Sequence, residues 1–142
     1  MSLLAGQSPR DLAEFLKAIK YPLQRQIVDS RSQVLKEACL LVTQIARSLA
    51  AARHNALELE RFLECFVSKG CLCKVLHSAN SVIHDMANAT IKSIFSIFTP
   101  HLGSPALMAR VLSVITELVE SKSTVVRVCG SEYLVSLSIS NL

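Results

Sequence analysis

The sequence has no tryptophan, and its aromatic residues amount to only 5% of 142 residues. Glycine and proline occur four times each, so the apolar half of the chain, 51% of its residues, consists mainly of Leu, Ile, Val and Ala. Such a composition favours helices packed on helices. Scarce aromatic residues also count against a surface that stacks nucleic-acid bases. We therefore expect an all-α protein with one sizeable core.

Long apolar runs are absent as well. A membrane-spanning helix needs about 20 predominantly apolar residues. The longest uncharged stretch, residues 93–109, is interrupted by two prolines and a glycine. The first residues, MSLLAGQSPRD, contain neither the basic segment nor the long apolar segment of a secretory signal. These absences predict a cytoplasmic chain without a membrane span.

No motif for catalysis is present: the sequence contains no glycine-rich phosphate loop, no GxSxG and no HExxH. Five cysteines, an odd number, suit a reducing compartment better than a disulfide framework. Cys65, Cys71, Cys73 and His77 raise the question of zinc, but no CxxC spacing occurs, and the thiols are more simply explained as buried apolar groups. We expect no enzymatic activity, no metal and no cofactor.

Apolar residues recur every three or four positions in six stretches, which predict helices over residues 9–28, 33–49, 56–76, 82–98, 105–120 and 125–137, with the third weakened at Gly70. Ser30 and Gln33 form the pattern of a capping box at the start of the second helix. Ser104, followed by a proline, predicts the start of the fifth. Pro22 predicts a kink or break at the preceding residue, because proline cannot donate a backbone hydrogen bond.

Three of these helices share an internal pattern. VLKEACLLVTQI from Val34, IHDMANATIKSI from Ile83 and VRVCGSEYLVSL from Val126 each have an aliphatic residue, a small residue four positions later, and aliphatic residues eight and eleven positions later. The copies begin 49 and 43 residues apart, near the period of HEAT and armadillo repeats. The pattern predicts an α-solenoid of about three helix pairs, in which the small residues allow close helix contact.

The segments DSRSQVLKEACLLVTQIA, IHDMANATIKSIF and SKSTVVRVCGSEYL resemble the TOG domains of the CLASP family of microtubule-associated proteins. The resemblance covers roughly residues 16–137 and implies HEAT repeats that bind tubulin or microtubules through their within-pair turns, in the cytoplasm at the cytoskeleton. TOG domains usually carry a tryptophan and more repeats than this chain. We assign residues 1–8 to a flexible tail and residues 9–142 to a TOG-like domain, complete or part of a longer one.

The resemblance also implies which residues contact tubulin. Arg31 and Lys122 match basic residues in the family's first and last turns, and Arg127 matches an arginine inside the following helix. The complete set of predicted tubulin-binding residues is Arg31, Lys122, Arg127, Ser30, Asn80 and Ser81. Val82 occupies a middle-turn position where the family commonly has lysine.

Charge gives an independent reason to examine Arg31. A cation at a helix N-terminus is disfavoured by about 0.3–1 kcal/mol, so Arg31 either serves an external carboxylate or is a solvated arginine. Lys122 is open to the same two interpretations, and Arg127 has a further one as a structural partner of Glu132 or Glu120. Residues 1–53 contain eight Lys or Arg against four Asp or Glu, which favours an acidic partner.

Other interpretations stay open at this point. The chain could be a HEAT scaffold that does not bind tubulin, an irregular helical bundle, or, because its N-terminal part is basic, a nucleic-acid-binding protein. Neither terminal helix pair is conspicuously polar on both sides. We therefore also expect an exposed apolar helix face, and with it self-association or contact with other HEAT repeats.

Overall fold

The computed structural model describes residues 9–29, 31–52, 56–68 and 70–140, with side chains from residue 14 onward. All regular structure in these ranges is helical, and no strand occurs in them. The elements are α1 (Pro9–Ile27), α2 (Ser32–Ala51), α3 (Ala56–Phe62), the π-helical turn η1 (Leu63–Val67), α4 (Leu72–Val75), α5 (Ser81–Phe98), the 3₁₀ turn η2 (Thr99–His101), α6 (Pro105–Val119) and α7 (Thr124–Ser140). The all-α prediction is confirmed. The predicted tail, residues 1–8, lies outside the described residues.

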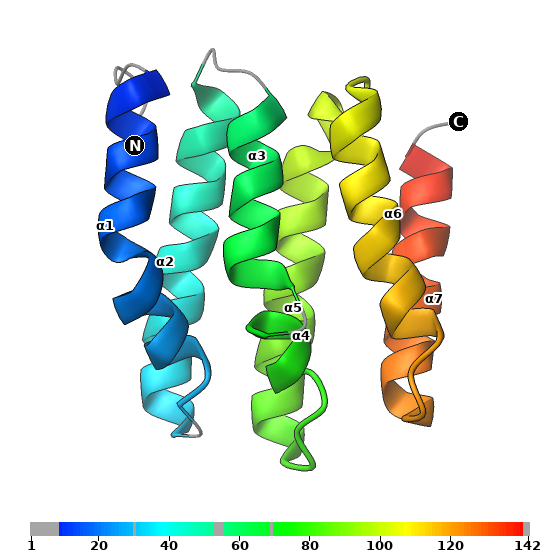
Figure 1. The fold of residues 1–142 in the computed structure, drawn as a ribbon. Helices are drawn as coiled ribbons and strands as arrows, with labels where there is room; N and C mark the ends of the chain where they lie inside the picture. The colour runs from blue at the N-terminus through cyan, green and yellow to red at the C-terminus, as the bar shows by residue number, and fades with distance from the viewer. Residues whose placement is uncertain (1–8, 30, 53–55, 69, 141–142) are drawn as a thin grey trace.

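The helices form two layers (Figure 1). In one layer α1 contacts α3 and α3 contacts α6; in the other, α2 contacts α5 and α5 contacts α7. Consecutive helices pair across the layers, α1 with α2, α4 with α5, and α6 with α7. The apolar faces of both layers therefore meet in one core.

Aromatic side chains are few, but three of them meet at the centre of the core. The Phe62 ring lies 5.2 Å from that of Phe66 and 5.6 Å from that of Phe98, measured between centroids. All three side chains are fully buried. The tilted and edge-on arrangements are those that aromatic pairs prefer. These contacts join the third predicted helix to the fourth without a large aromatic content.

Two predicted helix features differ in the structure. Pro22 is exposed and does not end the first helix, since α1 continues to Ile27; of the predicted kink or break, the break is therefore excluded. Gln24, just beyond it, donates from Nε2 to the Cys65 carbonyl oxygen at 2.6 Å, which ties the end of α1 to η1. The predicted helix over residues 56–76 is divided into α3, η1 and α4, and Gly70 lies between the last two.

The helix starts were predicted with mixed success. Ser104 is the N-cap of α6 and accepts a hydrogen bond from the Leu107 amide at 3.4 Å, as expected. The predicted capping box of Ser30 and Gln33 was wrong, because α2 begins one residue later than this box requires. Arg31 is the N-cap of α2 without a side-chain capping bond, and Gln33 donates to Glu37 at 3.5 Å instead. Ser30 itself lies outside the described residues.

The small residues of the repeated pattern are buried where helices approach. Ala38 and Ala87 are 1% and 0% exposed, and Gly130 is also buried. A Cβ atom on Gly130 would lie 3.0 Å from Leu118 Cβ and 3.1 Å from the Val119 backbone nitrogen. Close contact between α6 and α7 therefore requires the absence of a side chain at this position.

A series of polar contacts fixes α7 against α5. The Tyr133 hydroxyl donates to Asn88 Oδ1 at 2.6 Å, and Lys92 Nζ lies 3.4 Å from a Glu132 carboxylate oxygen. One turn earlier, the Cys129 thiol is 3.7 Å from Nε2 of a histidine on α5, His84. The spacing of 45 residues in two of these pairs resembles the period of the repeat.

One helix retains a second apolar face that nothing in the described chain covers. Its exposed aliphatic residues are Val125, Val128, Val135 and Ile139, all on one side of α7, the last helix of its layer. Such a face agrees with the expectation drawn from the composition of the terminal helices.

Candidate interaction edge at the within-pair turns

The three predicted turns lie at the same end of the molecule. Residues 28–31 connect α1 to α2, residues 76–80 connect α4 to α5, and residues 120–123 connect α6 to α7; Figure 1 shows all three connections at the lower end. We call this end the turn edge. Of the predicted tubulin-binding residues, Arg31, Asn80, Ser81, Lys122 and Arg127 are on or directly beside it.

In the first turn Arg31 is paired within the chain. Its Nε and backbone amide each donate to Asp29 Oδ1 at 3.0 Å, and its Nη2 donates to Oδ2 at 2.8 Å. The hydrogen bonds from Arg31 lower the pKa of the Asp29 carboxyl to about 2, and the pairing raises the pKa of Arg31. The Arg31 side chain is nevertheless 76% exposed. It is thus neither buried nor simply solvated.

The middle turn is organised by Asn80, whose Oδ1 caps α5. It accepts from the Val82 amide at 2.9 Å and from the Ile83 amide at 3.2 Å. The backbone amide of Asn80 donates to the Ser78 hydroxyl at 3.1 Å. Ser81 is exposed, and Val82 is 56% exposed. The centre of the turn edge therefore presents polar uncharged groups and one aliphatic side chain.

In the last turn Arg127 folds back onto the preceding residues. Its Nη1 donates to the carbonyl oxygens of Ser121 and Lys122 at 2.8 and 3.1 Å, and its Nη2 donates to Thr124 Oγ1 at 3.0 Å. The alternative interpretation of Arg127 as a partner of Glu132 or Glu120 was wrong, because no ion pair joins Arg127 to either carboxylate among the described residues and Glu132 pairs with Lys92. Arg127 stabilises the shape of the turn from which Lys122 extends.

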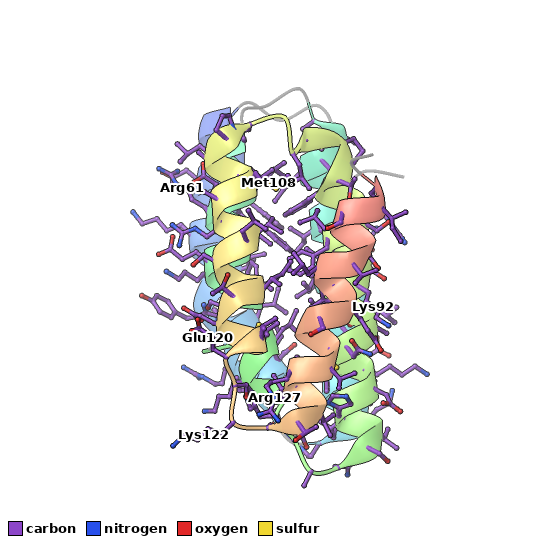
Figure 2. The ribbon with its side chains drawn as sticks, turned by 90° about the vertical axis from the view of Figure 1, so that its right-hand side faces the viewer. Arg61, Lys92, Met108, Glu120, Lys122 and Arg127 are labelled. Atoms are coloured by element: carbon purple, nitrogen blue, oxygen red, sulfur yellow. The ribbon has the colours of Figure 1, made fainter. Side chains whose placement is uncertain are left out.

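Lys122 is the freest cation of the turn edge. It is exposed, and no hydrogen bond or ion pair links its side chain to a described residue. Figure 2 shows it extending from the lower end of the molecule, whereas Arg127 lies against the turn. An arginine with three of its five donors satisfied and a neighbouring free lysine leave this turn able to bind an anion.

A histidine that sequence reasoning did not assign to the edge connects two of its turns. His77 Nδ1 is 2.8 Å from the Cys73 carbonyl oxygen, which requires a proton on Nδ1, and His77 Nε2 is 3.1 Å from Ser121 Oγ. Ser121 also accepts from the Ser123 amide at 3.1 Å. His77 and Ser121 are 44 residues apart, which is close to the repeat period. This separation was the one feature of the sequence that could have predicted their contact.

The remaining candidate chemistry has structural explanations. His84 Nδ1 is 2.7 Å from the carbonyl oxygen of Leu76, the C-cap of α4, and its other nitrogen faces Cys129. Burial raises the pKa of the Cys129 thiol, so this pair does not hold a thiolate. Among the described residues, no group of three or more metal-ligating side chains occurs, and no helix is long and apolar enough to cross a membrane.

Comparisons with protein-family models, with curated proteins and with solved structures find no match to this chain.

Proposed function

We propose that this chain is a non-enzymatic, TOG-like module of HEAT repeats that binds tubulin or microtubules and regulates microtubule dynamics at the cytoskeleton. The observation that carries the proposal is the common placement of the three within-pair turns at one edge, with exposed cations in the first and last. Two layers of helices paired in chain order also agree with an α-solenoid of about three helix pairs. The sequence resemblance supplies the identity of the partner.

The geometry suits an extended acidic surface. Neighbouring packed helices lie about 8–10 Å apart, so turns two pairs apart should be separated by about 20 Å. Arg31 and Lys122 are therefore spaced to contact two different acidic groups of one partner. The Arg31 pairing with Asp29 holds its guanidinium at the start of α2, and bidentate exchange to an external carboxylate is chemically reasonable for arginine.

A second function is favoured by specific observations. Asp29 already forms an ion pair with Arg31, and the middle turn exposes Val82 where a cation would be needed. Both features reduce the attraction of the turn edge for an acidic surface. A HEAT-repeat scaffold that binds a protein other than tubulin is therefore the alternative.

The test is binding of the purified chain to tubulin, measured by fluorescence anisotropy, and to microtubules, measured by co-sedimentation. The variant Arg31→Ala with Lys122→Ala should weaken binding by at least tenfold with little change in helicity or melting temperature, because exposed charges contribute only ~0–1 kcal/mol to folding. Raising the salt concentration should also weaken it, since the Debye length falls from about 10 Å at 0.1 M to about 3 Å at 1 M.

A matched control removes two exposed cations elsewhere. Lys17→Ala with Arg110→Ala makes the same change in net charge on α1 and α6, away from the turn edge, and should leave binding intact. Val82→Lys should strengthen binding by supplying the missing central cation. Equal loss in both double variants would indicate a nonspecific charge effect, and no binding by the parent chain would favour the scaffold.

A further inference from the structure

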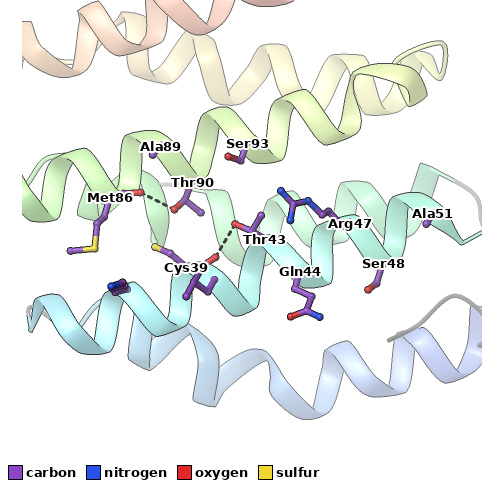
Figure 3. A pocket seen from close by; sticks show the side chains of 12 residues that line it. Cys39, Thr43, Gln44, Arg47, Ser48, Ala51, Met86, Ala89, Thr90 and Ser93 are labelled. Carbon is purple, nitrogen blue, oxygen red and sulfur yellow. Dashed lines mark hydrogen bonds between the residues drawn. The ribbon is translucent and has the colours of Figure 1, made fainter. Parts of the chain in front are cut away.

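A groove separate from the turn edge runs between α2 and α5. It has a volume of 810 Å³, and every residue lining it belongs to one of these two helices. Figure 3 shows Thr43 and Arg47 of α2 pointing toward α5, while Gln44 points away from it. Because no other described helix contributes to its lining, the groove lies open on the outer face of its layer.

The floor of the groove is more apolar than its composition suggests. Thr43 donates from Oγ1 to the Cys39 carbonyl oxygen at 2.8 Å, and Thr90 donates to the Met86 carbonyl oxygen at 2.7 Å, as the dashed lines of Figure 3 mark. Hydroxyls bonded to their own helix are not available to a ligand, so the threonines can contribute apolar methyl contact. Ala89 adds only a methyl group to the lining, which leaves room for another backbone to approach.

A large apolar residue borders this floor. Leu40 lines the groove and is 60% exposed, which places an aliphatic side chain in water at its rim. Met86 lines the opposite side from α5. Methionine adapts its shape to different apolar partners. Together these side chains provide apolar contact on both walls.

The charge of the groove is positive and unbalanced. Lys36 and Arg47 line it, no carboxylate does, and neither cation pairs with any residue in the described ranges. Lys36 and Arg47 are eleven residues apart on α2, which is about three helical turns and ~16 Å. Their side chains therefore extend from the same face of α2. Arg47 reaches from α2 toward α5 in Figure 3.

In two other concave regions of the described chain, the cations have partners or are matched by carboxylates. The groove beside α7 is lined by Lys92 and Arg127, but Glu132 pairs with Lys92 at 3.4 Å, and Arg127 donates to the last turn. The cavity between α1 and α3 has cations and carboxylates in equal number: Lys17, Lys20, Arg61, Glu14, Glu58 and Glu64. An apolar floor between two unpaired cations is therefore a specific property of the α2–α5 groove among these three.

We infer that the α2–α5 groove binds an amphipathic helix of a partner protein, one whose apolar face is bordered by carboxylates about eleven residues apart. A helix laid along the groove presents residues at i, i+3 or i+4, and i+7 to the floor. Carboxylates three turns apart then reach Lys36 and Arg47 together, and Arg47 can bind its carboxylate through two hydrogen bonds. This inference does not depend on tubulin binding at the turn edge.

The experiment uses two fluorescein-labelled helical peptides with the same leucine and alanine face. One carries glutamate at two positions eleven residues apart, and the other carries lysine at both. Anisotropy titrations with the full chain should show the glutamate peptide binding at least tenfold more tightly than the lysine peptide. Ala89→Phe, which fills the floor at an exposed position without changing charge, should also weaken binding of the glutamate peptide.

The charge dependence is tested with matched variants. Lys36→Glu with Arg47→Glu should abolish binding of the glutamate peptide, whereas Lys17→Glu with Arg110→Glu, which changes the net charge equally, should preserve it; circular dichroism verifies that both variants are folded. Equal affinity for the two peptides, binding unchanged in the groove variant, or no binding of the glutamate peptide would overturn the inference. So would a dimer of the parent chain, seen by sedimentation, that the groove variant dissociates, because a second copy would then occupy the groove.

Discussion

The Arg31 guanidinium holds both carboxylate oxygens of Asp29, two residues earlier in the chain, at 3.0 and 2.8 Å. Asp29 lies just before α2, near the helix end that favours negative charge. Its carboxylate therefore offsets the unfavourable position of the arginine. A cation is tolerated at the start of α2 because its counter-charge is supplied by the same turn.

This pairing should be visible in the titration of Asp29. The ionised carboxylate has a pKa of about 2, so its pairing is complete above the ordinary aspartate pKa of about 3.9 and is lost as the pH falls through about 2. Arg31→Ala should raise the pKa toward the ordinary value, and Arg31→Lys should give an intermediate result. Carboxyl carbon shifts of Asp29, followed by NMR against pH, provide the measurement. An ordinary pKa in the parent chain would contradict the pairing in solution.

Removing the internal competitor should affect the proposed function. Asp29→Asn abolishes the ion pair and removes one negative charge from the turn edge, so we expect several-fold tighter binding to tubulin. Glu14→Gln, at an exposed position on α1, makes the same charge change as a control. Weaker binding of the Asp29→Asn variant would mean that Arg31 needs Asp29 to be correctly oriented. Anisotropy with purified tubulin distinguishes these results.

Gly130→Ala should loosen the contact between α6 and α7. The new methyl group would meet Leu118 Cβ at 3.0 Å and the Val119 backbone at 3.1 Å, and neither is the end of a flexible side chain. Overpacking costs about 1–3 kcal/mol, against about 1 kcal/mol gained from the better helix propensity of alanine. We expect a net loss of about 1 kcal/mol in urea unfolding.

The control for that substitution is Gly103→Ala. Nothing lies within 4 Å of a Cβ at this exposed glycine, and its φ angle is not positive. Stability should stay the same or increase by about 0.4–1 kcal/mol, because alanine restricts the unfolded chain. Equal effects at the two glycines would argue against close packing at Gly130.

Tyr133→Phe should weaken the attachment of α7 to α5. The substitution preserves the ring, which packs edge-on against Phe95 at 5.7 Å, but it leaves Asn88 Oδ1 without the hydroxyl donor. We expect a loss of about 1 kcal/mol in urea unfolding. Burial raises the pKa of Tyr133, so its hydroxyl should keep its proton, and this bond, into strongly alkaline solution.

Tyr21 provides the matched control, because its side chain is 68% exposed. Tyr21→Phe should change the free energy of unfolding by no more than about 0.5 kcal/mol. A Tyr133→Phe variant as stable as this control would show that the bond to Asn88 contributes nothing measurable.

The cysteines should resist alkylation while the chain is folded. Burial raises the pKa of all five thiols, to about 12 for Cys71 and Cys73, and only Cys65 is partly exposed. Since the thiolate is the reactive form, iodoacetamide at pH 8 should label Cys65 first and all five quickly in guanidinium. Mass spectrometry of the labelled peptides gives the rates. Labelling of Cys73 as fast as Cys65 in the native chain would refute the buried placement.

Local signals in the sequence predicted much of the helical framework. Ser104 before a proline defined the start of α6, the small residues Ala38 and Ala87 are buried, and Gly130 lies at a close helix contact as predicted. Pro22 did not end α1, because an exposed position allows the helix to continue past a missing hydrogen bond. The π-helical turn had no recognisable signal, since an apolar pattern with a period near 3.6 does not distinguish one extra residue in a turn.

The candidate site was predicted less completely than the fold. Sequence resemblance selected Arg31, Lys122 and Arg127, but it could not indicate that only Lys122 is without a partner among the described residues. The Arg31 pairing depends on the conformation of its turn. The bonds of Arg127 to the last turn depend on how the chain reverses between α6 and α7.

By itself, the sequence determined the helices, the repeated register and the placement of cations in the outer turns, because periodicity, caps and charge are local properties. Tertiary structure decided the bond between His77 and Ser121, the pairing of Asn88 with Tyr133 and the groove between α2 and α5. Each of these joins residues at least 40 positions apart or surfaces of two helices. Such contacts arise only when the core holds the layers together. A hydrogen bond needs a short distance between donor and acceptor, so the helices must be correctly aligned before it can form.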